Sequence, residues 1–159
     1  MSTAIQSRPR QIGQRRTFAL VASQYNSEFV NGLVDHARRE FEAISSNFSF
    51  VNYEVPGAFE IPLVVQEVAT RGGIDAILAL GVIIEGQTQH AALVARAVTD
   101  ALMQIGLAQR LPIIHEVLLL QNEAQAKARC LEDEINRGTD AARAAARMVQ
   151  TMSTLRSSR

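Results

Sequence analysis

The segment 81–90 runs from an apolar stretch into an Ala-rich stretch with helical spacing, and it ends on His90. Gly86 permits an unusual backbone conformation there, and Thr88 can cap the following helix. Free N–H groups at such a helix start bind anions, and an imidazole in the first turn can transfer protons beside them. These residues predict an anion site with an acid/base at His90, although an exposed polar residue at a helix end would give the same pattern.

The proline-framed segment 55–62 carries a second group of candidate side chains. Its two prolines and Gly57 fix the path of the chain tightly. Glu60 then falls in the first turn of a helix, where it either accepts hydrogen bonds from ligand hydroxyls or only balances the charge of the helix end. Phe59 is compatible with a ligand contact and equally with the core.

Three further side chains are candidates for ligand contacts. Tyr25 follows the first apolar run and can stack on a planar ligand, though by itself it is typical of a surface turn. Arg129 can clamp phosphate oxygens in a bidentate fork or lie on a solvated helix face. His115 lies within an apolar run, where a histidine is more often a hydrogen-bonded, partly buried residue than a catalyst.

Several classes of site are excluded by what the sequence lacks. The segment after the first apolar run has no glycine, so the dinucleotide fingerprint is absent, and no ATPase phosphate loop occurs anywhere. A single cysteine, Cys130, rules out an internal disulfide and a cysteine-rich metal site. No metal is therefore expected.

The elements that must position these residues alternate along the chain. Short apolar or β-rich runs predict strands, and stretches with apolar residues at helical spacing predict helices between them. The order β-α-β-α-β-α-β-α-α is typical of parallel strands joined by right-handed crossovers. The predicted strands cover 17–23, 48–55, 74–84 and 112–120, and the predicted helices cover 26–44, 58–70, 89–108, 123–134 and 138–152.

The predicted fold class is α/β, a three-layer α/β/α sandwich around a four-stranded parallel sheet in a flavodoxin-like order. The strands are apolar on both sides, as a sheet covered by helices requires. Ligands of such sheets bind beyond the carboxyl ends of the strands. Because Tyr25, Glu60 and His90 each follow a strand, the function is expected at that edge of the sheet.

The length of 159 residues suits one domain with its own core. The zero net charge hides a split: residues 1–16 carry four arginines and no acid, and residues 17–151 carry ten basic and 16 acidic side chains. We expect a flexible basic arm over 1–16, a single domain over 17–152 and a frayed tail over 153–159.

The same composition argues against several partners and locations. A nucleic-acid binder normally shows a basic excess, which this chain lacks. No apolar run approaches the roughly 20 residues of a membrane span. The arm has no apolar core of a secretory signal, so we expect a cytoplasmic protein without nucleic-acid or membrane partners.

Three runs of the sequence together resemble the lumazine synthase family: VPGAFEIP at 55–62, LGVIIEGQTQH at 80–90, and QAKAR at 125–129 followed by NRGTDAA at 136–142. The likeness extends over roughly residues 17–150. It implies a cofactor-independent transferase of riboflavin biosynthesis, which condenses 5-amino-6-(D-ribitylamino)uracil with 3,4-dihydroxy-2-butanone 4-phosphate. The products would be 6,7-dimethyl-8-ribityllumazine, phosphate and water, formed through an imine, loss of phosphate and ring closure.

The resemblance also implies roles at the matching positions. His90 would transfer protons, and Tyr25 would stack on the pyrimidine. The uracil and ribityl chain would be held by Ala58, Phe59 and Glu60 and by the backbone of Val82, Ile83 and Ile84. The phosphate would be held by Gln87, Thr88 and Arg129, with Asp140 supporting that arginine.

Family sites are completed across a subunit boundary by a residue of the neighbour's fourth strand. That position is His115 here, where the family commonly has phenylalanine. Histidine can still stack and adds a titratable group, so we expect His115→Phe to retain activity. Glu85 and Asp133 also depart from the family pattern, in which basic residues are common, and these departures bear on ligand affinity and higher assembly.

Assembly follows from the same likeness, because family members form homopentamers and some build a 60-subunit shell. Riboflavin synthase is then a candidate partner, and the arm 1–16 would add a strand to a neighbour's sheet. No insertion separates Arg129 from Asn136, which permits a shell. Ile135 replaces a glycine often found in shell formers, so the pentamer is the primary expectation.

Two other functions are compatible with the fold. A non-catalytic paralogue would bind flavin or a pyrimidine, or act as an assembly shell, but a shell needs none of Glu60, His90 and Arg129. A generic flavodoxin-like nucleotide binder is disfavoured by the missing phosphate loop. Turnover separates the enzyme from the paralogue, which would bind flavin tightly without it.

Overall fold

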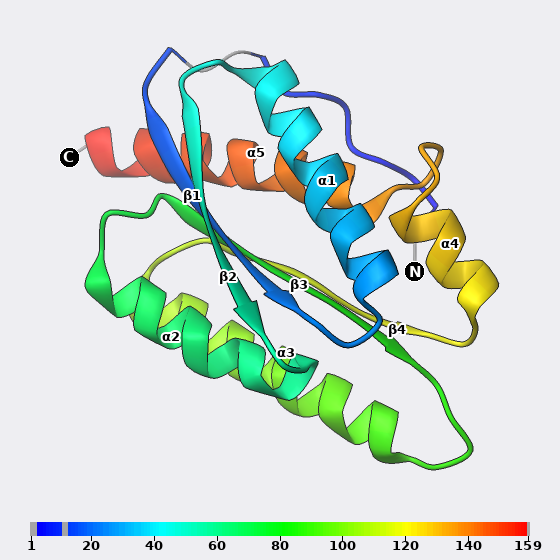
Figure 1. The fold of residues 1–159 in the computed structure, drawn as a ribbon. Helices are drawn as coiled ribbons and strands as arrows, with labels where there is room; N and C mark the ends of the chain where they lie inside the picture. The colour runs from blue at the N-terminus through cyan, green and yellow to red at the C-terminus, as the bar shows by residue number, and fades with distance from the viewer. Residues whose placement is uncertain (1–2, 11–12, 159) are drawn as a thin grey trace.

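The computed structural model describes residues 3–10 and 13–158 (Figure 1). Its strands are β1 (Arg16–Ser23), β2 (Phe48–Val55), β3 (Ala76–Ile84) and β4 (Ile113–Leu120). Its helices are α1 (Ser27–Ile44), α2 (Ile61–Arg71), α3 (His90–Gln109), α4 (Glu123–Cys130) and α5 (Arg137–Ser157). A short 3-10 turn, Ala58–Glu60, leads into α2.

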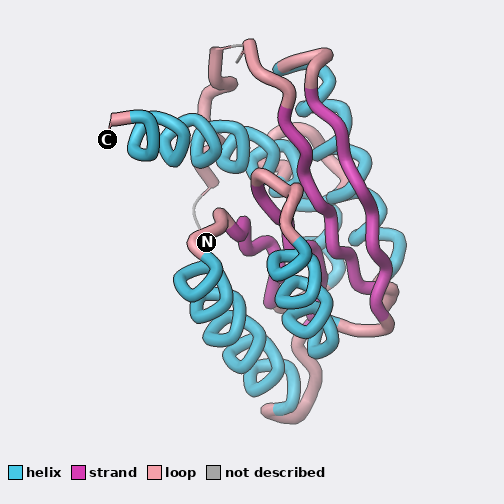
Figure 2. Tube along the Cα trace, turned by 90° about the vertical axis from the view of Figure 1, so that its left-hand side faces the viewer, coloured by secondary structure: helices cyan, strands magenta, loops and turns pink. Residues whose placement is uncertain are grey.

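The four strands form one parallel sheet in the order β2-β1-β3-β4. Helices α1, α4 and α5 cover one face of this sheet, and α2 and α3 cover the other (Figures 1 and 2). The predicted α/β/α sandwich is therefore confirmed. Because β1 and β3 are neighbours in the centre, the segments that follow their carboxyl ends lie side by side.

Alternate residues of β1 point into two separate cores. Phe18 and Leu20 pack with α1 and α5, and Ala19 and Val21 pack with α2 and α3. The Phe18 ring stacks on Phe41 of α1 with centroids 4.3 Å apart, an arrangement that aromatic pairs favour. Burial on both faces explains why this strand is apolar throughout.

Helix α5 lies close to α1 because small residues line its buried side. A Cβ added at Gly138 would overlap the carbonyl group of Leu33 in α1. The same side continues with the buried residues Ala141, Ala142, Ala145 and Ala146. The Ala-rich sequence thus sets the distance between these two helices.

Two predicted helices begin or end elsewhere in the structure. The helix predicted over 58–70 starts as a 3-10 turn, because Pro62 has no N–H and belongs in the first α-helical turn. The helix predicted over 123–134 ends at Cys130. The Asn136 side chain donates to the Glu132 carbonyl and accepts from the first N–H groups of α5. These hydrogen bonds turn the chain, so the helix does not continue to residue 134.

The residues 153–157, predicted as part of a frayed tail, continue α5 to Ser157. Arg156 donates from Nη2 to the carbonyl of Arg110 at 2.6 Å, which ties this last part of α5 to the end of α3. Arg159 lies outside the described residues.

Helix α3 is the one described helix that is long and apolar enough to cross a membrane, judged by length and composition alone, and the sequence did not predict this. Val98 and Leu102 pack on the sheet, whereas Leu107 is exposed. Arg96 and Asp100, 3.9 Å apart, lie within the helix, and such charges are costly inside a bilayer. The helix is apolar because one of its faces packs on the sheet and because exposed apolar residues, Leu107 among them, lie on its other face.

Candidate functional site

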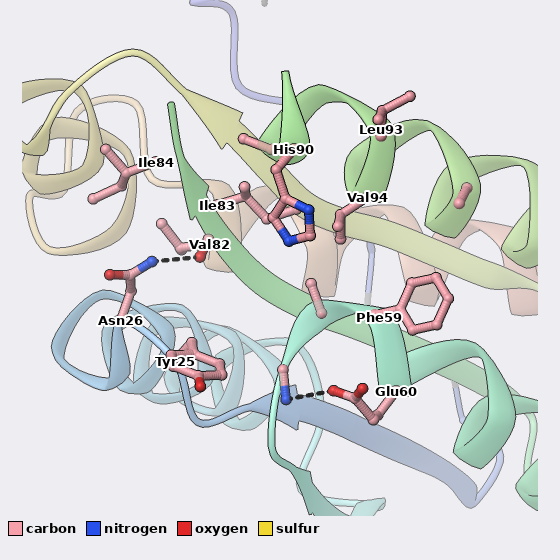
Figure 3. A pocket seen from close by; sticks show the side chains of 14 residues that line it. Tyr25, Asn26, Phe59, Glu60, Val82, Ile83, Ile84, His90, Leu93 and Val94 are labelled. Atoms are coloured by element: carbon pink, nitrogen blue, oxygen red, sulfur yellow. Dashed lines mark hydrogen bonds between the residues drawn. The ribbon is translucent and has the colours of Figure 1, made fainter. Parts of the chain in front are cut away.

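A cavity of about 740 Å³ opens beyond the carboxyl ends of β1 and β3 (Figure 3). The turn 58–60 and the start of α3 form its other walls. Eight residues predicted for the site line it: Tyr25, Ala58, Phe59, Glu60, Val82, Ile83, Ile84 and His90. The edge of the sheet at which function was expected therefore carries a concave site, the usual setting of a small-molecule ligand.

Tyr25 and Phe59 offer two aromatic faces to this cavity. The Tyr25 side chain is 73% exposed and Phe59 is 64% exposed, so the core alternative for Phe59 is wrong. A Cβ at Gly57 would lie 3.2 Å from the Tyr25 ring, so glycine allows the ring to lie against the 56–57 backbone. The Tyr25 N–H also donates to the Pro56 carbonyl at 3.2 Å. The ring is thereby held where a planar ligand can stack on it.

Glu60 braces the turn on which it lies. Its Oε2 accepts a hydrogen bond from the Gly57 N–H at 2.9 Å, drawn as a dashed line in Figure 3. A carboxylate has a second oxygen and further lone pairs. Glu60 can therefore stabilise its own loop and still accept hydrogen bonds from ligand hydroxyls. A local structural role and a ligand-binding role are compatible for this residue.

Asn26 connects the β1–α1 turn to β3. The residue adopts the left-handed conformation with φ 56°, and its Nδ2 donates to the Val82 carbonyl at 2.7 Å. β3 pairs with β1 only as far as Leu80, opposite Ala22, and runs on to Ile84. The protruding end of β3 thus offers backbone groups to the cavity, but the Val82 carbonyl already has a partner.

His90 is exposed on the first turn of α3, and its ring points from the helix toward the 58–60 turn (Figure 3). The Thr88 Oγ1 accepts a long hydrogen bond, 3.4 Å, from the His90 N–H. Gln89, rather than Thr88, occupies the capping position. Gln87 and Thr88 are exposed and lie outside the cavity lining, in the loop that leads into α3.

His115 lies away from this cavity, on the α3 side of β4. Its Nε2 is 2.7 Å from Thr99 Oγ1, and that hydroxyl donates its single proton to the Ala95 carbonyl at 2.8 Å. Both hydrogen bonds of the Thr99 hydroxyl form together only when His115 Nε2 is the donor. Burial lowers the pKa of His115 from its ordinary value, although its backbone hydrogen bond opposes this.

Asp140 also lies outside the cavity, within a buried ionic cluster. Its Oδ2 is 3.0 Å from Arg137 Nη1, and Arg137 donates to Glu116 from Nη2 at 3.0 Å and from Nε at 3.3 Å. Burial raises the pKa of Glu116 to about 7, although the charge and hydrogen bonds of Arg137 work against it. Asp140 thus supports Arg137 directly.

Arg129 lies on α4, likewise outside the cavity lining. Burial raises the pKa of the neighbouring Cys130 thiol to about 12; the charge of Glu116 adds to this effect and that of Arg129 opposes it. Helices α4 and α5 cover the same face of the sheet, so Arg129 lies on the same side of the molecule as the Glu116–Arg137–Asp140 cluster. A thiol of this kind is inert as a nucleophile.

The sequence profile of the 6,7-dimethyl-8-ribityllumazine synthase family matches residues 15–153. The chain belongs to this family. The 6,7-dimethyl-8-ribityllumazine synthase of Burkholderia vietnamiensis is 39% identical over 144 residues, covering 90% of this chain and 83% of the relative. Proteins of the same name from Burkholderia cenocepacia and Polaromonas sp. are 38% and 34% identical over the same length, covering 82% and 91% of their own chains.

Within this lumazine synthase fold, three structurally important residues had no predicted role. Asn26 was detectable as an asparagine directly before a helix, where it favours a cap or a left-handed turn. Arg137 lies inside the NRG run at 136–138 that carried the family resemblance. The sequence indicated no role for Glu116, because Glu116 lies close to Arg137 only in the folded chain. No group of three or more metal-binding side chains occurs within residues 3–10 and 13–158.

Proposed function

We propose that this chain is a lumazine synthase, which condenses 5-amino-6-(D-ribitylamino)uracil with 3,4-dihydroxy-2-butanone 4-phosphate to give 6,7-dimethyl-8-ribityllumazine, phosphate and water. One observation carries the proposal: in a chain of this family, a single cavity collects an aromatic face, a carboxylate, a strand edge and a histidine. Those are the groups needed to hold a polar planar ring with a hydroxylated chain and to move protons beside it.

Each lining group has a distinct part in this proposal. The Tyr25 ring stacks on the pyrimidine, and the protruding end of β3 up to Ile84 offers backbone groups to its polar edge. The free oxygen of Glu60 accepts hydrogen bonds from ribityl hydroxyls. His90 faces the reacting atoms and moves protons as the amine attacks the ketone, water leaves and the imine forms.

The phosphate end of the second substrate is placed at the start of α3. Gln87 and Thr88 lie in the loop leading into that helix, whose first N–H groups favour an anion. Elimination of phosphate then precedes ring closure by the ribityl-bearing nitrogen. Bound there, the phosphorylated substrate presents its ketone toward His90.

Three residues assigned to the site by family likeness, His115, Arg129 and Asp140, lie outside the cavity of their own chain. We propose that a neighbour in a homo-oligomer, a pentamer by family likeness, brings these residues to the cavity rim. Exposed apolar residues that line the cavity support the contact: Phe59 and Leu93.

The direct test is formation of lumazine by the purified protein from the two substrates, followed by absorbance, together with the particle mass in solution. Turnover by an oligomer is the expected result. A well-folded protein that binds flavin tightly but forms no lumazine would instead identify the non-catalytic paralogue. A monomer with full activity would contradict the shared site while leaving the reaction intact.

A further inference from the structure

Thr99 and His115 meet where α3 packs against β4. Val98 and Leu102 of α3 and Val117 of β4 belong to one core on this side of the sheet. Because side chains alternate along a strand, His115 points to the same face as Val117. Thr99 follows Val98 at the edge of this packing contact, and its Oγ1 lies 2.7 Å from His115 Nε2.

The Thr99 hydroxyl is itself fixed by the helix on which it lies. A threonine in a helix has two accessible side-chain rotamers, and one of them lets Oγ1 bond a carbonyl one turn back. Here Oγ1 donates to the Ala95 carbonyl at 2.8 Å. Since the hydroxyl has one proton, it then offers a lone pair to the Nε2–H of His115. Thr99 is therefore a fixed acceptor rather than a freely rotating hydroxyl.

Open space beside the imidazole makes this acceptor important. His115 and Thr99 both line a cavity of about 500 Å³, whose other lining residues include Leu102, Met103 and Met148. The cavity leaves room for the His115 ring to change rotamer, so apolar packing alone does not define the direction of the ring. The hydrogen bond to Thr99 selects one orientation.

A histidine at position 115 needs a partner that a phenylalanine would not need. The imidazole is half-buried, and an N–H that loses its acceptor in such a place is costly. Burial also lowers the pKa of His115, which favours the neutral ring with a single N–H. Rotation of a phenylalanine ring by half a turn changes nothing, whereas the same rotation of an imidazole exchanges its polar and apolar edges.

We propose that Thr99 is a positioning residue for His115: its hydroxyl, fixed by the Ala95 carbonyl, accepts the Nε2–H and holds the ring in one orientation and one tautomer. The inference rests on the proposed function, in which His115 of one subunit contacts the planar pyrimidine bound in the cavity of the next. Thr99 touches no substrate in this proposal and acts only through the ring.

Three substitutions separate the hydroxyl from the shape of the side chain. Thr99→Val keeps the branched shape and removes the acceptor, whereas Thr99→Ser keeps the hydroxyl. The matched control is Thr151→Val, because Thr151 Oγ1 makes the same kind of hydrogen bond to the Arg147 carbonyl of its own helix, at 3.0 Å. The thermal midpoint of each full-length variant shows whether the chain remains folded.

The first measurement is nitrogen NMR of the histidine rings in alkaline buffer, where they are neutral. The chain has three histidines, and the signal that disappears in His115→Phe identifies His115. The wild type, Thr99→Ser and Thr151→Val should show His115 protonated at Nε2. Thr99→Val should show a mixture of the two tautomers, because the acceptor for that proton is lost.

The second measurement is steady-state kinetics with the two substrates. Thr99→Val should raise KM for the pyrimidine about five-fold, the usual effect of one neutral hydrogen bond, and leave KM for the phosphorylated substrate unchanged. Thr99→Ser should restore the wild-type value. In the His115→Phe background, Thr99→Val should have no effect on KM, because the double-mutant cycle then removes the partner of the hydroxyl.

An unchanged His115 tautomer in Thr99→Val would overturn the proposal, as would an equal rise in KM with and without His115. Failure of serine to restore the wild-type signal would also reject it, since the hydroxyl would then not be the cause. Wild-type protein that shows the valine-specific tautomer change but forms no lumazine would reject the proposed reaction and leave the hold of Thr99 on His115 standing.

Discussion

His90 combines two features at the residue scale: a place on the first turn of α3 and a ring directed at the cavity. We expect His90→Asn to lower kcat about 100- to 10,000-fold, because a positioned acid/base contributes a factor of that size. KM for both substrates should change little, since asparagine keeps a polar side chain there. Steady-state kinetics test this, with the neighbouring change Gln89→Ala as control, and an unchanged kcat would remove His90 from the mechanism.

Glu116 makes the free energy of unfolding depend on pH. Its carboxyl keeps a proton in the folded chain up to about pH 7, whereas the unfolded chain releases it near 4.5. The folded state therefore binds more protons in this window, and the contribution of Glu116 is present at low pH and is lost as pH rises through 7. A pKa raised from 4.5 to about 7 corresponds to about 3 kcal/mol.

The variant Glu116→Gln tests that dependence. Its free energy of unfolding should fall less between pH 5 and pH 8 than that of the wild type, by up to about 3 kcal/mol. Denaturant titrations at both pH values and one fixed protein concentration give the comparison, with the exposed change Glu28→Gln as control. Identical pH dependence in wild type and Glu116→Gln would show that Arg137 keeps Glu116 ionised.

The positions of some site candidates were predictable from the sequence because they depend on strand order alone. Tyr25, Glu60 and His90 each follow a predicted strand, and the parallel sheet brings them to one cavity. The pairing of Glu116 with Arg137 was not accessible, because it depends on how α5 packs against β4. The same holds for Asn26, whose partner Val82 is set by how far β3 protrudes beyond β1.

At the scale of elements, Gly138 sets the approach of α5 to α1. An added Cβ would overlap the Leu33 carbonyl, and neither backbone can move without shifting a whole helix. We expect Gly138→Ala to lower the free energy of unfolding by about 1–3 kcal/mol, the usual cost of overpacking. Chemical denaturation measures it against Gly13→Ala, where a Cβ meets nothing within 4 Å. Equal stability of the two variants would contradict the close approach.

The order and type of the elements were predictable, but several ends were not. The strands were predicted from apolar or β-rich runs, which are typical of a parallel sheet covered on both faces. β2 has the predicted bounds 48–55. The 3-10 start before α2 depends on Pro62, and the early end of α4 depends on the side-chain hydrogen bonds of Asn136. The extension of α5 to Ser157 depends on the distant carbonyl of Arg110. The first two effects are local side-chain effects and the third is a tertiary contact, and apolar periodicity reports neither kind.

At the scale of the whole molecule, the proposed sharing of one site between two subunits predicts complementation between them. His90→Asn and Arg129→Ala should each be nearly inactive when assembled alone. Mixed after dissociation and reassembled in equal amounts, they should regain up to about a quarter of wild-type turnover, since a random neighbour pair carries both intact groups in that proportion. Activity no higher than the mean of the single variants would place His90 and Arg129 in the same subunit's site.

The neutral total charge also has a structural counterpart. Arg8 of the basic arm pairs with Glu40, and Arg16 pairs with Asp75 at 3.1 Å. Part of the basic charge of residues 1–16 is therefore balanced by acids of the same chain. Strand addition to a neighbour remains a prediction, and an arm that docks in this way competes with it.

The exposed Tyr25 ring has a spectroscopic consequence. The chain has no tryptophan and only two tyrosines, so its ultraviolet emission comes from Tyr25 and Tyr53 alone when excitation lies at wavelengths that phenylalanine does not absorb. Tyr25 lines the cavity and Tyr53 does not. A pyrimidine that stacks on Tyr25 will quench close to half of that signal, so the native chain carries its own optical probe of site occupancy and needs no attached dye.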